Sequence, residues 1–185
     1  FKELVLLAKL NPGKYTWATS GLGTTSHLSE EMLNRGLKLG MEIISYKGAV
    51  PQLTDVMGGH VTAAVSPMPG VSGFIKSGHL KALAVTSDKR LPNMANLPTV
   101  SESGMPGFEM YSWYGLWGPA NLPKPIVSML SKQVAITLKN KNVRDRMAEL
   151  DFEPSTASTA QFEKIVKDEI SKVGAIVREA NISID

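Results

Sequence analysis

The feature that most constrains the fold is a change of pattern near residue 88. Before it, short apolar strands alternate with amphipathic helices, whereas three amphipathic helices follow it with one candidate strand. Alternating strands and helices are typical of βαβ units and a mostly parallel sheet. The sequence therefore predicts an α/β fold whose second part presents apolar helix faces to a sheet that it does not itself contain.

The first part of the chain is expected to hold four strands, rich in β-branched and aromatic residues, and four helices. Ala82–Val85 is apolar throughout, which indicates a strand buried on both faces of a sheet. The strands are expected at 15–19, 41–46, 61–65 and 80–86, and the helices at 2–10, 25–37, 49–57 and 70–76.

The second part opens with a long irregular connection, residues 88–108, in which proline and glycine recur. An aromatic strand is expected at 111–117. Helices are then expected from Pro125, around Val143 to Leu150, and from Ser158, where Gln161 completes a capping-box pattern.

Composition excludes several classes of protein. The chain has no cysteine, so disulfides, thiol catalysis and the usual thiolate zinc sites are excluded. Its net charge of +3 comes without a Lys/Arg block, so nucleic acid is not an expected partner. The chain begins at Phe1 and its early apolar run is too short for a membrane helix or a signal-peptide core, so we expect a longer precursor.

The segment Ser20–His27 joins an expected strand to an expected helix and contains two glycines. Glycine permits positive φ and close approach of a ligand to the backbone. The helix start adds free N–H groups, a positive dipole end and several hydroxyls, which together suit an anion. The alternative is a tight turn with a Ser/Thr helix cap and no ligand.

Two further loops follow expected strands. Tyr46–Ala49 could supply a lysine cation and a tyrosine hydroxyl, and Ser66 could donate a hydrogen bond. In open α/β sheets, ligands bind outside the carboxyl ends of the strands, so these loops are expected to converge with the first. The alternatives are a solvated lysine, a core tyrosine and a rigid Pro-rich turn.

No catalytic or metal-binding motif is evident. His27, His60 and His79 lack the i, i+3 or i, i+4 spacing of metal ligands, and no Gly-x-Ser-x-Gly elbow occurs. No catalytic residue, metal or cofactor is therefore expected. One alternative remains an α/β enzyme for a small anionic metabolite, using Ser20, His27 and Lys47. Another is a non-binding chain that self-associates through its exposed helix faces.

An ordered set of motifs across nearly the whole chain resembles the substrate-binding receptors of tripartite tricarboxylate transporters, the Bug family. The most specific are the Gly-x-Gly loop with its histidine and the Pro-Thr-Val-x-Glu-x-Gly stretch. The matching segments are Asn11–Lys14, Ser20–Gly23 with His27, Tyr46–Gly48, Leu53–Gly59, Ala82–Thr86, Pro98–Gly104 and Trp117–Ala120.

The resemblance implies a periplasmic-binding-protein type II (Venus flytrap) architecture in which two lobes capture a small carboxylate. Residues 1–108 would form one near-complete, ligand-binding lobe with a parallel-rich sheet. Residues 109–185 would supply a returning strand and the C-terminal helices of the other lobe, whose N-terminal part is missing from this chain. The implied partners are a di- or tricarboxylate or related organic acid and the membrane components of the transporter, and the implied location is the periplasm.

The site expected from the loops and the resemblance together is a surface of backbone amides, hydroxyls and one cation that captures a carboxylate without changing it. Its expected members are Ser20, Gly21, Gly23, Thr24, Thr25, Ser26, His27, Tyr46, Lys47, Gly48, Ala49 and Ser66.

Overall fold

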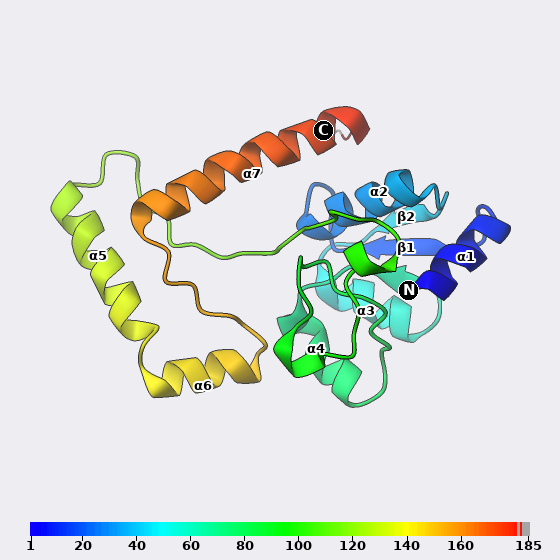
Figure 1. Cartoon of the computed structure of the whole chain (residues 1–185), viewed down its shortest axis with the longest axis horizontal. Helices are drawn as coiled ribbons and strands as arrows, with labels where there is room; N and C mark the ends of the chain where they lie inside the picture. Colours follow the sequence, from blue (N-terminus) through cyan, green and yellow to red (C-terminus); the bar gives the residue numbers. More distant parts are fainter. Residues whose placement is uncertain (181, 183–185) are drawn as a thin grey trace. The chain divides into compact units, whose positions relative to one another are not determined.

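Short strands alternate with helices in the first part of the chain, and helices dominate the second part (Figure 1). The computed structural model describes residues 1–180 and 182. In chain order the elements are α1 (Lys2–Leu10), β1 (Thr16–Thr19), α2 (Thr25–Leu37), β2 (Glu42–Ser45), α3 (Ala49–Met57), β3 (Ala63–Ala64), α4 (Met68–Lys76), the 3₁₀ turns η1 (Pro92–Met94) and η2 (Ser101–Ser103), α5 (Lys124–Thr137), α6 (Lys141–Glu149) and α7 (Thr159–Ala180).

The three strands form one parallel sheet in the order β2-β1-β3, so the predicted α/β fold is confirmed. Trp17 of the central strand is in register with Ile43 on one side and Ala63 on the other. The chain steps from β1 to β2 in one direction and from β2 to β3 in the other. Because such crossovers are right-handed, α2 and α3 must cover opposite faces, as Figure 1 shows.

The core of the sheet region forms where β1 meets α2. Trp17 is 3% exposed, and Leu33 of α2 is 1% exposed. The indole Nε1 of Trp17 donates to Asn34 Oδ1 over 3.0 Å, and Asn34 Nδ2 donates to the Met41 carbonyl over 2.6 Å. These bonds satisfy polar groups inside the core and fix α2 against β1 and the segment that leads into β2.

The prediction of a strand at 80–86 is wrong. Residue Val85 makes one isolated parallel bridge with Thr99, and no continuous strand forms there. The backbone bonds go to the 88–108 connection instead: the Val85 N–H donates to the Pro98 carbonyl, and the Val85 carbonyl accepts from Val100 N–H, both over 2.9 Å. The two-residue strand β3 offers too short an edge to recruit a fourth strand. Residues 82–84 are accordingly half-buried rather than enclosed on both faces.

The prediction of an aromatic strand at 111–117 is also wrong. In the part of the chain that the structure describes, this segment has no strand pairing, and its aromatic side chains are exposed. An extended segment becomes a strand only when another backbone edge accepts its hydrogen bonds. The expected helices after it do form, as α5, α6 and α7.

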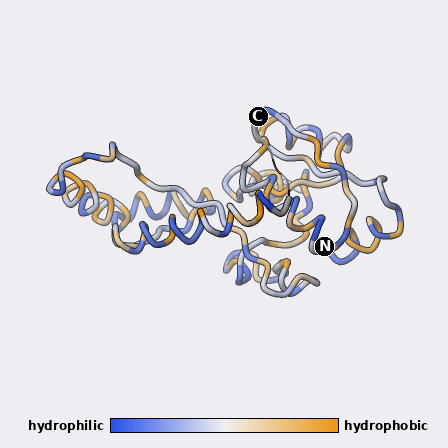
Figure 2. The backbone as a smooth tube through the Cα atoms, turned by 90° about the horizontal axis from the view of Figure 1, so that it is seen from above, coloured by the Kyte–Doolittle hydropathy of each residue, from blue (hydrophilic) through white to orange (hydrophobic). Residues whose placement is uncertain are grey.

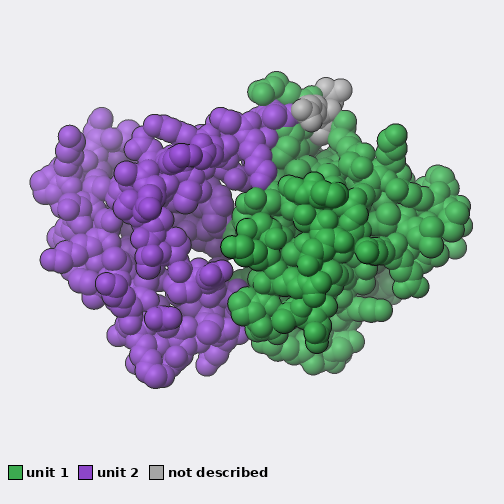
Figure 3. All heavy atoms as spheres, in the orientation of Figure 1, with its two compact units in different colours: residues 1–112, 176–185 green, residues 113–175 purple. Residues whose placement is uncertain are grey.

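The described chain divides into two compact units (Figure 3). Unit 1 comprises residues 1–112 and 176–185, and unit 2 comprises residues 113–175; residues 181 and 183–185 lie outside the described residues. Unit 2 has an aromatic cluster in which Phe162 lies 5.4 Å from Trp113 and 5.2 Å from Trp117, between ring centroids. Hydrophobic and hydrophilic residues alternate along its helices (Figure 2).

The capping box predicted at the start of the last helix is confirmed. The Ser158 N–H donates to Gln161 Oε1 over 2.8 Å, and the Gln161 N–H donates to Ser158 Oγ over 3.3 Å. This reciprocal pair satisfies two of the amides that a helix start leaves free. The local sequence therefore marks the residue at which α7 starts.

Candidate ligand-binding site

The sheet creates a natural ligand position at the carboxyl ends of β1 and β2. These neighbouring strands run parallel, but the chain leaves β1 toward α2 on one face and leaves β2 toward α3 on the other. The loops that follow both strands nevertheless start at the same edge of the sheet, outside the carboxyl ends of the strands, where open α/β sheets bind ligands. The two glycine-bearing loops of the expected site follow these two strands.

The first loop turns through two glycines before α2 begins. Gly21 and Gly23 have φ of 152° and 73°, values that favour glycine. Thr24 is the N-cap of α2: its hydroxyl donates to the Gly21 carbonyl over 2.7 Å and accepts from the His27 N–H over 3.3 Å. The loop thus presents exposed Thr24 and half-buried Thr25 at the positive end of α2.

The second loop lies against the first. The Gly48 N–H donates to the Ser20 carbonyl, and the Tyr46 N–H donates to the Thr19 carbonyl, both over 2.9 Å. Gly48 is the N-cap of α3 with φ 109°, and among the described residues no side chain caps this helix start. Two helix N-termini therefore flank the joined loops, and exposed Lys47 and Ala49 lie beside them.

Two of the expected site residues are buried and bonded within the protein. Ser26 is 5% exposed and its hydroxyl donates to the Val65 carbonyl. His27 is 6% exposed, and its Nδ1 accepts from the Gly23 N–H over 3.2 Å. His27 thus takes up the hydrogen bond of one loop amide, that of Gly23, and so stabilises the turn from the buried side.

The acceptor role of His27 requires an unprotonated Nδ1, and its surroundings favour the neutral ring. Burial lowers the pKa of His27 below its ordinary value of 6.5, and Glu31, whose Oε1 lies 4.0 Å from Nε2, opposes that shift. The neutral imidazole can therefore accept the Gly23 hydrogen bond, and this bond in turn favours the neutral form of the ring.

The Tyr46 hydroxyl is also engaged within the protein. It donates to Asp55 Oδ2 over 2.7 Å, and this bond is the main cause of a raised Tyr46 pKa. Tyr46 thereby ties the second loop to α3, which carries Asp55. The Tyr46 hydroxyl is therefore already bonded within the protein.

Ser66 follows β3, the third strand end, and differs from the other expected residues. Its side-chain oxygen is buried and has no hydrogen-bond partner among the described residues. The preceding residue is bonded through its carbonyl to Ser26 of α2 and to Gln52 of α3. The structure therefore links the third loop to the helices of the first two.

Sequence reasoning missed two buried polar residues beneath this site, Glu30 and Gln52, each 0% exposed. Gln52 Nε2 donates to the Ala18 carbonyl over 2.6 Å, while Glu30 Oε1 accepts from the Val65 N–H over 3.0 Å. Their helices carry polar residues on several faces, so periodicity alone does not single them out. The one feature of the sequence that could have identified them is their position: each is a polar residue at a helix position where the periodicity places an apolar one.

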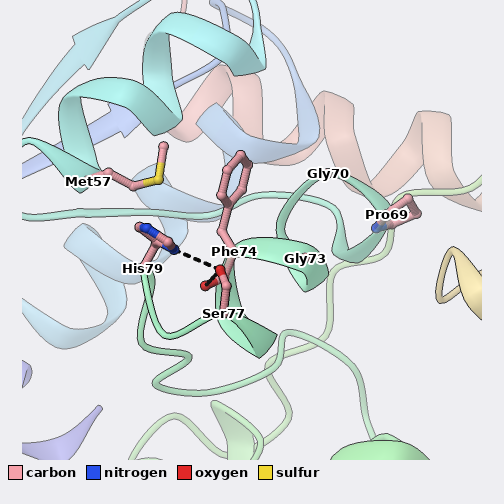
Figure 4. A pocket seen from close by; sticks show the side chains of 7 residues that line it. All are labelled: Met57, Pro69, Gly70, Gly73, Phe74, Ser77 and His79. Carbon is pink, nitrogen blue, oxygen red and sulfur yellow. Dashed lines mark hydrogen bonds between the residues drawn. The ribbon is translucent and has the colours of Figure 1, made fainter.

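A separate cavity of about 490 Å³ lies between the end of α3 and α4 (Figure 4). The Ser77 hydroxyl and His79 Nδ1 hydrogen bond there over 2.8 Å. None of the expected site residues lines this cavity, whose lining is Met57, Pro69, Gly70, Gly73, Phe74, Ser77 and His79.

Two negative findings apply to the described residues. Histidines, aspartates and glutamates form no group of three or more that could hold a metal ion. No described helix combines the length and apolar character that a bilayer crossing requires.

Comparison with known proteins supports a single family. The family profile described as "Tripartite tricarboxylate transporter family receptor" matches residues 1–182. A relative, BugT of Bordetella pertussis, is 30% identical over 181 residues, which are 98% of this chain and 56% of BugT. The chain therefore spans about half the length of the curated relatives it matches.

Solved structures agree over the whole chain. A structure from R. palustris with adipate has a TM-score of 0.90 at 30% identity, covering 98% of this chain and 60% of that one. The periplasmic binding protein BugD has a TM-score of 0.88 at 34% identity, covering 99% and 62%. MatC from Rhodopseudomonas palustris with bound malate has a TM-score of 0.84 at 27% identity, covering 96% and 61%. The chain belongs to the tripartite tricarboxylate transporter receptor family.

Proposed function

We propose that this chain is the greater part of a periplasmic receptor that captures a small dicarboxylate for a tripartite tricarboxylate transporter. The observation that carries this proposal is the bond from the Gly48 N–H to the Ser20 carbonyl, which joins two glycine loops between two helix N-termini. Free amides and positive dipole ends attract a carboxylate. Lys47 beside them adds a full positive charge.

The proposed ligand surface consists of the exposed and half-buried members of the expected set. Buried Ser26 and His27 stabilise this surface without being part of it. Ser26 donates to the Val65 carbonyl, and His27 accepts from the Gly23 amide. The relatives solved with adipate and malate favour a dicarboxylate over a monocarboxylate. The proposed contacts are Ser20, Gly21, Gly23, Thr24, Thr25, Tyr46, Lys47, Gly48, Ala49 and Ser66.

Capture without chemistry is favoured over catalysis. The enzyme alternative needs His27 as a base near Ser20 and Lys47, whereas His27 Nδ1 already accepts from Gly23 and its ring is buried. The chain also belongs to a family of receptors. A reaction at this site would have to recruit a base from elsewhere.

The two-lobe organisation remains part of the proposal. We assign residues 1–108 to the ligand-binding lobe and residues 109–185 to a returning segment and the C-terminal helices of the other lobe. Exposed Tyr114, Leu116 and Trp117, at 63–71%, support an uncovered apolar segment that further chain would bury. The relative described as a periplasmic binding protein supports the location, and the family description supports the membrane partner.

The proposal is tested by nuclear magnetic resonance on the 185-residue chain with added adipate. We expect adipate to shift the amide signals of residues 21–25 and 47–49 in a saturable way. Adipamide, which has the same length without the charges, should leave these signals in place. Shifts confined to the cavity lined by Phe74 and His79, or no saturable shifts, would contradict the proposal.

The charge contribution is tested by a matched pair of variants. Lys47→Gln removes the cation beside the second loop, and we expect it to weaken adipate binding by up to about fivefold, as loss of one surface charge contact does. Lys14→Gln removes a lysine that lies over the Tyr15 ring, before β1, and should leave binding unchanged. Equal effects from both would mean that net charge alone attracts the ligand.

A further inference from the structure

The backbone of Val65 is held by side chains rather than by the sheet. Strand β3 ends at Ala64, so Val65 lies one residue beyond the last paired position. Its N–H donates to Glu30 Oε1 over 3.0 Å, while its carbonyl accepts from Ser26 Oγ and from Gln52 Nε2. Helices on both faces of the sheet thus fix the start of the loop that carries Ser66.

Glu30 is the unusual member of this arrangement. Its side chain is 0% exposed, one carboxyl oxygen accepts from Val65, and the other has no partner among the described residues. A buried ionised carboxylate normally has a cation or several donors beside it. A buried carboxylic acid needs only one acceptor for its proton, and the hydroxyls of Thr19 and Ser26 lie close enough to affect it.

The electrostatics of Glu30, like its hydrogen bonding, favour the protonated carboxylic acid. Burial raises the pKa of Glu30 to about 8, and the negative charge of Glu31 adds to that rise. The Val65 N–H and the hydroxyls of Thr19 and Ser26 oppose it without reversing it. Thr19 of β1 and Val65 at the end of β3, which face Glu30, are uncharged. Gln52 of α3, which bonds to the Val65 carbonyl, is also uncharged, and neighbouring His27 of α2 favours its neutral form.

We propose that Glu30 is a positioning residue that holds the Val65–Ser66 segment against α2 while it carries a proton and releases this segment when the proton leaves. As a neutral acid, Glu30 accepts from the Val65 N–H and donates its proton to a neighbouring hydroxyl. As an anion it has no cation to offset its burial, so the enclosure must open toward water. The third loop of the site would then lose its anchor.

The consequence for ligand capture rests on the proposed function, whereas the anchor itself does not. A negative charge beneath the loops repels a carboxylate, and a displaced Ser66 withdraws a donor. Adipate affinity is therefore expected to fall as the pH rises through about 8, a range in which free aliphatic carboxylates no longer titrate. Protonation of Glu30 would favour the binding-competent form.

The direct test follows the carboxyl carbon of Glu30 in the wild-type chain by nuclear magnetic resonance. We expect its signal to titrate with a midpoint near 8. A midpoint near 4.5 would overturn the proposal, because Glu30 would then be ionised at neutral pH. This measurement needs no variant and therefore does not depend on a variant folding.

The anchor is tested by hydrogen exchange at the Val65 amide, corrected for the intrinsic pH dependence of exchange. In the wild type, protection should fall up to about tenfold for each pH unit between the ordinary glutamate pKa of 4.5 and the Glu30 pKa of about 8, and should level off above it. Glu30→Gln keeps both an acceptor and a donor but cannot ionise, so protection should stay level. Glu42→Gln, the same change at an exposed position, should behave as wild type. Identical pH profiles for wild type and Glu30→Gln would overturn the proposal.

Adipate titrations across the same pH range separate this inference from the proposed function. A level profile for Glu30→Gln together with a falling profile for the wild type would support both the proposed function and the role of Glu30. Absence of adipate binding together with pH-dependent Val65 protection would contradict only the proposed function. Adipate binding with the same pH dependence in both proteins would contradict only the role of Glu30.

Discussion

Thr24 is the residue at which the glycine loop becomes a helix. Its hydroxyl bonds on one side to the Gly21 carbonyl and on the other to the His27 N–H. Thr24→Ala removes both bonds, and loss of an N-cap of this kind costs about 1 kcal/mol. We expect the free energy of unfolding to fall by that amount in urea titrations, and adipate binding to weaken because the loop loses its shape.

A conservative variant separates the cap from the bulk of the side chain. Thr24→Ser keeps the hydroxyl and should retain wild-type stability within about 0.5 kcal/mol, since serine and threonine are comparable caps. If serine and alanine destabilise the protein equally, the methyl group of Thr24 rather than its hydroxyl holds the loop.

At the residue scale, sequence predicts what local chemistry determines. The Gly21 and Gly23 turn and the hydroxyl cap at the start of α2 are both present as expected. The burial of Glu30 could not be predicted, because it depends on Val65, just after β3, which approaches α2 from a distant part of the sequence. A hydroxyl or carboxyl on the inner face of a helix looks the same in sequence whether water or a strand end covers it.

At the scale of the element, Gly48 governs how the second loop enters α3. Its φ of 109° and ψ of 171° lie in a region that is essentially restricted to glycine, and forcing another residue there costs about 1–3 kcal/mol. We expect Gly48→Ala to lower the free energy of unfolding by that amount. Because the Gly48 N–H bonds to Ser20, amide signals of the first loop should shift as well.

Gly70 is the matched control for that substitution. It lies within α4, its φ is not positive, and an added Cβ would meet nothing within 4 Å. Alanine is favoured over glycine inside a helix by up to about 1 kcal/mol, so Gly70→Ala should stabilise the protein. Opposite signs at the two positions would tie the cost at Gly48 to its backbone conformation, and equal signs would remove that explanation.

The elements that sequence predicts well are those whose hydrogen bonds are local. The bounds of α1, α2 and α3 follow directly from periodicity and caps, and the capping box starts α7 as expected. The strands expected at 80–86 and 111–117 fail because a strand needs a partner edge. The first gives its bonds to the 98–110 segment, and the second meets no partner among the described residues.

At the scale of the whole molecule, the surface of residues 113–175 matters most. Trp117 is 63% exposed and Tyr114 is 71% exposed, although both belong to aromatic contacts inside this unit. Monomeric proteins rarely expose large apolar patches. This surface is what the two-lobe proposal requires, and self-association of the isolated chain would cover the same side chains.

The last prediction concerns how tightly this chain alone can hold a ligand. Each charge-assisted hydrogen bond contributes about 1.5–3 kcal/mol, while association costs at least about 4 kcal/mol. Two or three such bonds from one set of loops leave little surplus, so adipate and malate should bind with Kd of about 1 mM or weaker. Calorimetry on the 185-residue chain measures this, with light scattering on the same sample to report its oligomeric state. A micromolar Kd in a monomer would mean that one lobe suffices for capture, whereas a micromolar Kd in a dimer would mean that a second copy closes the site.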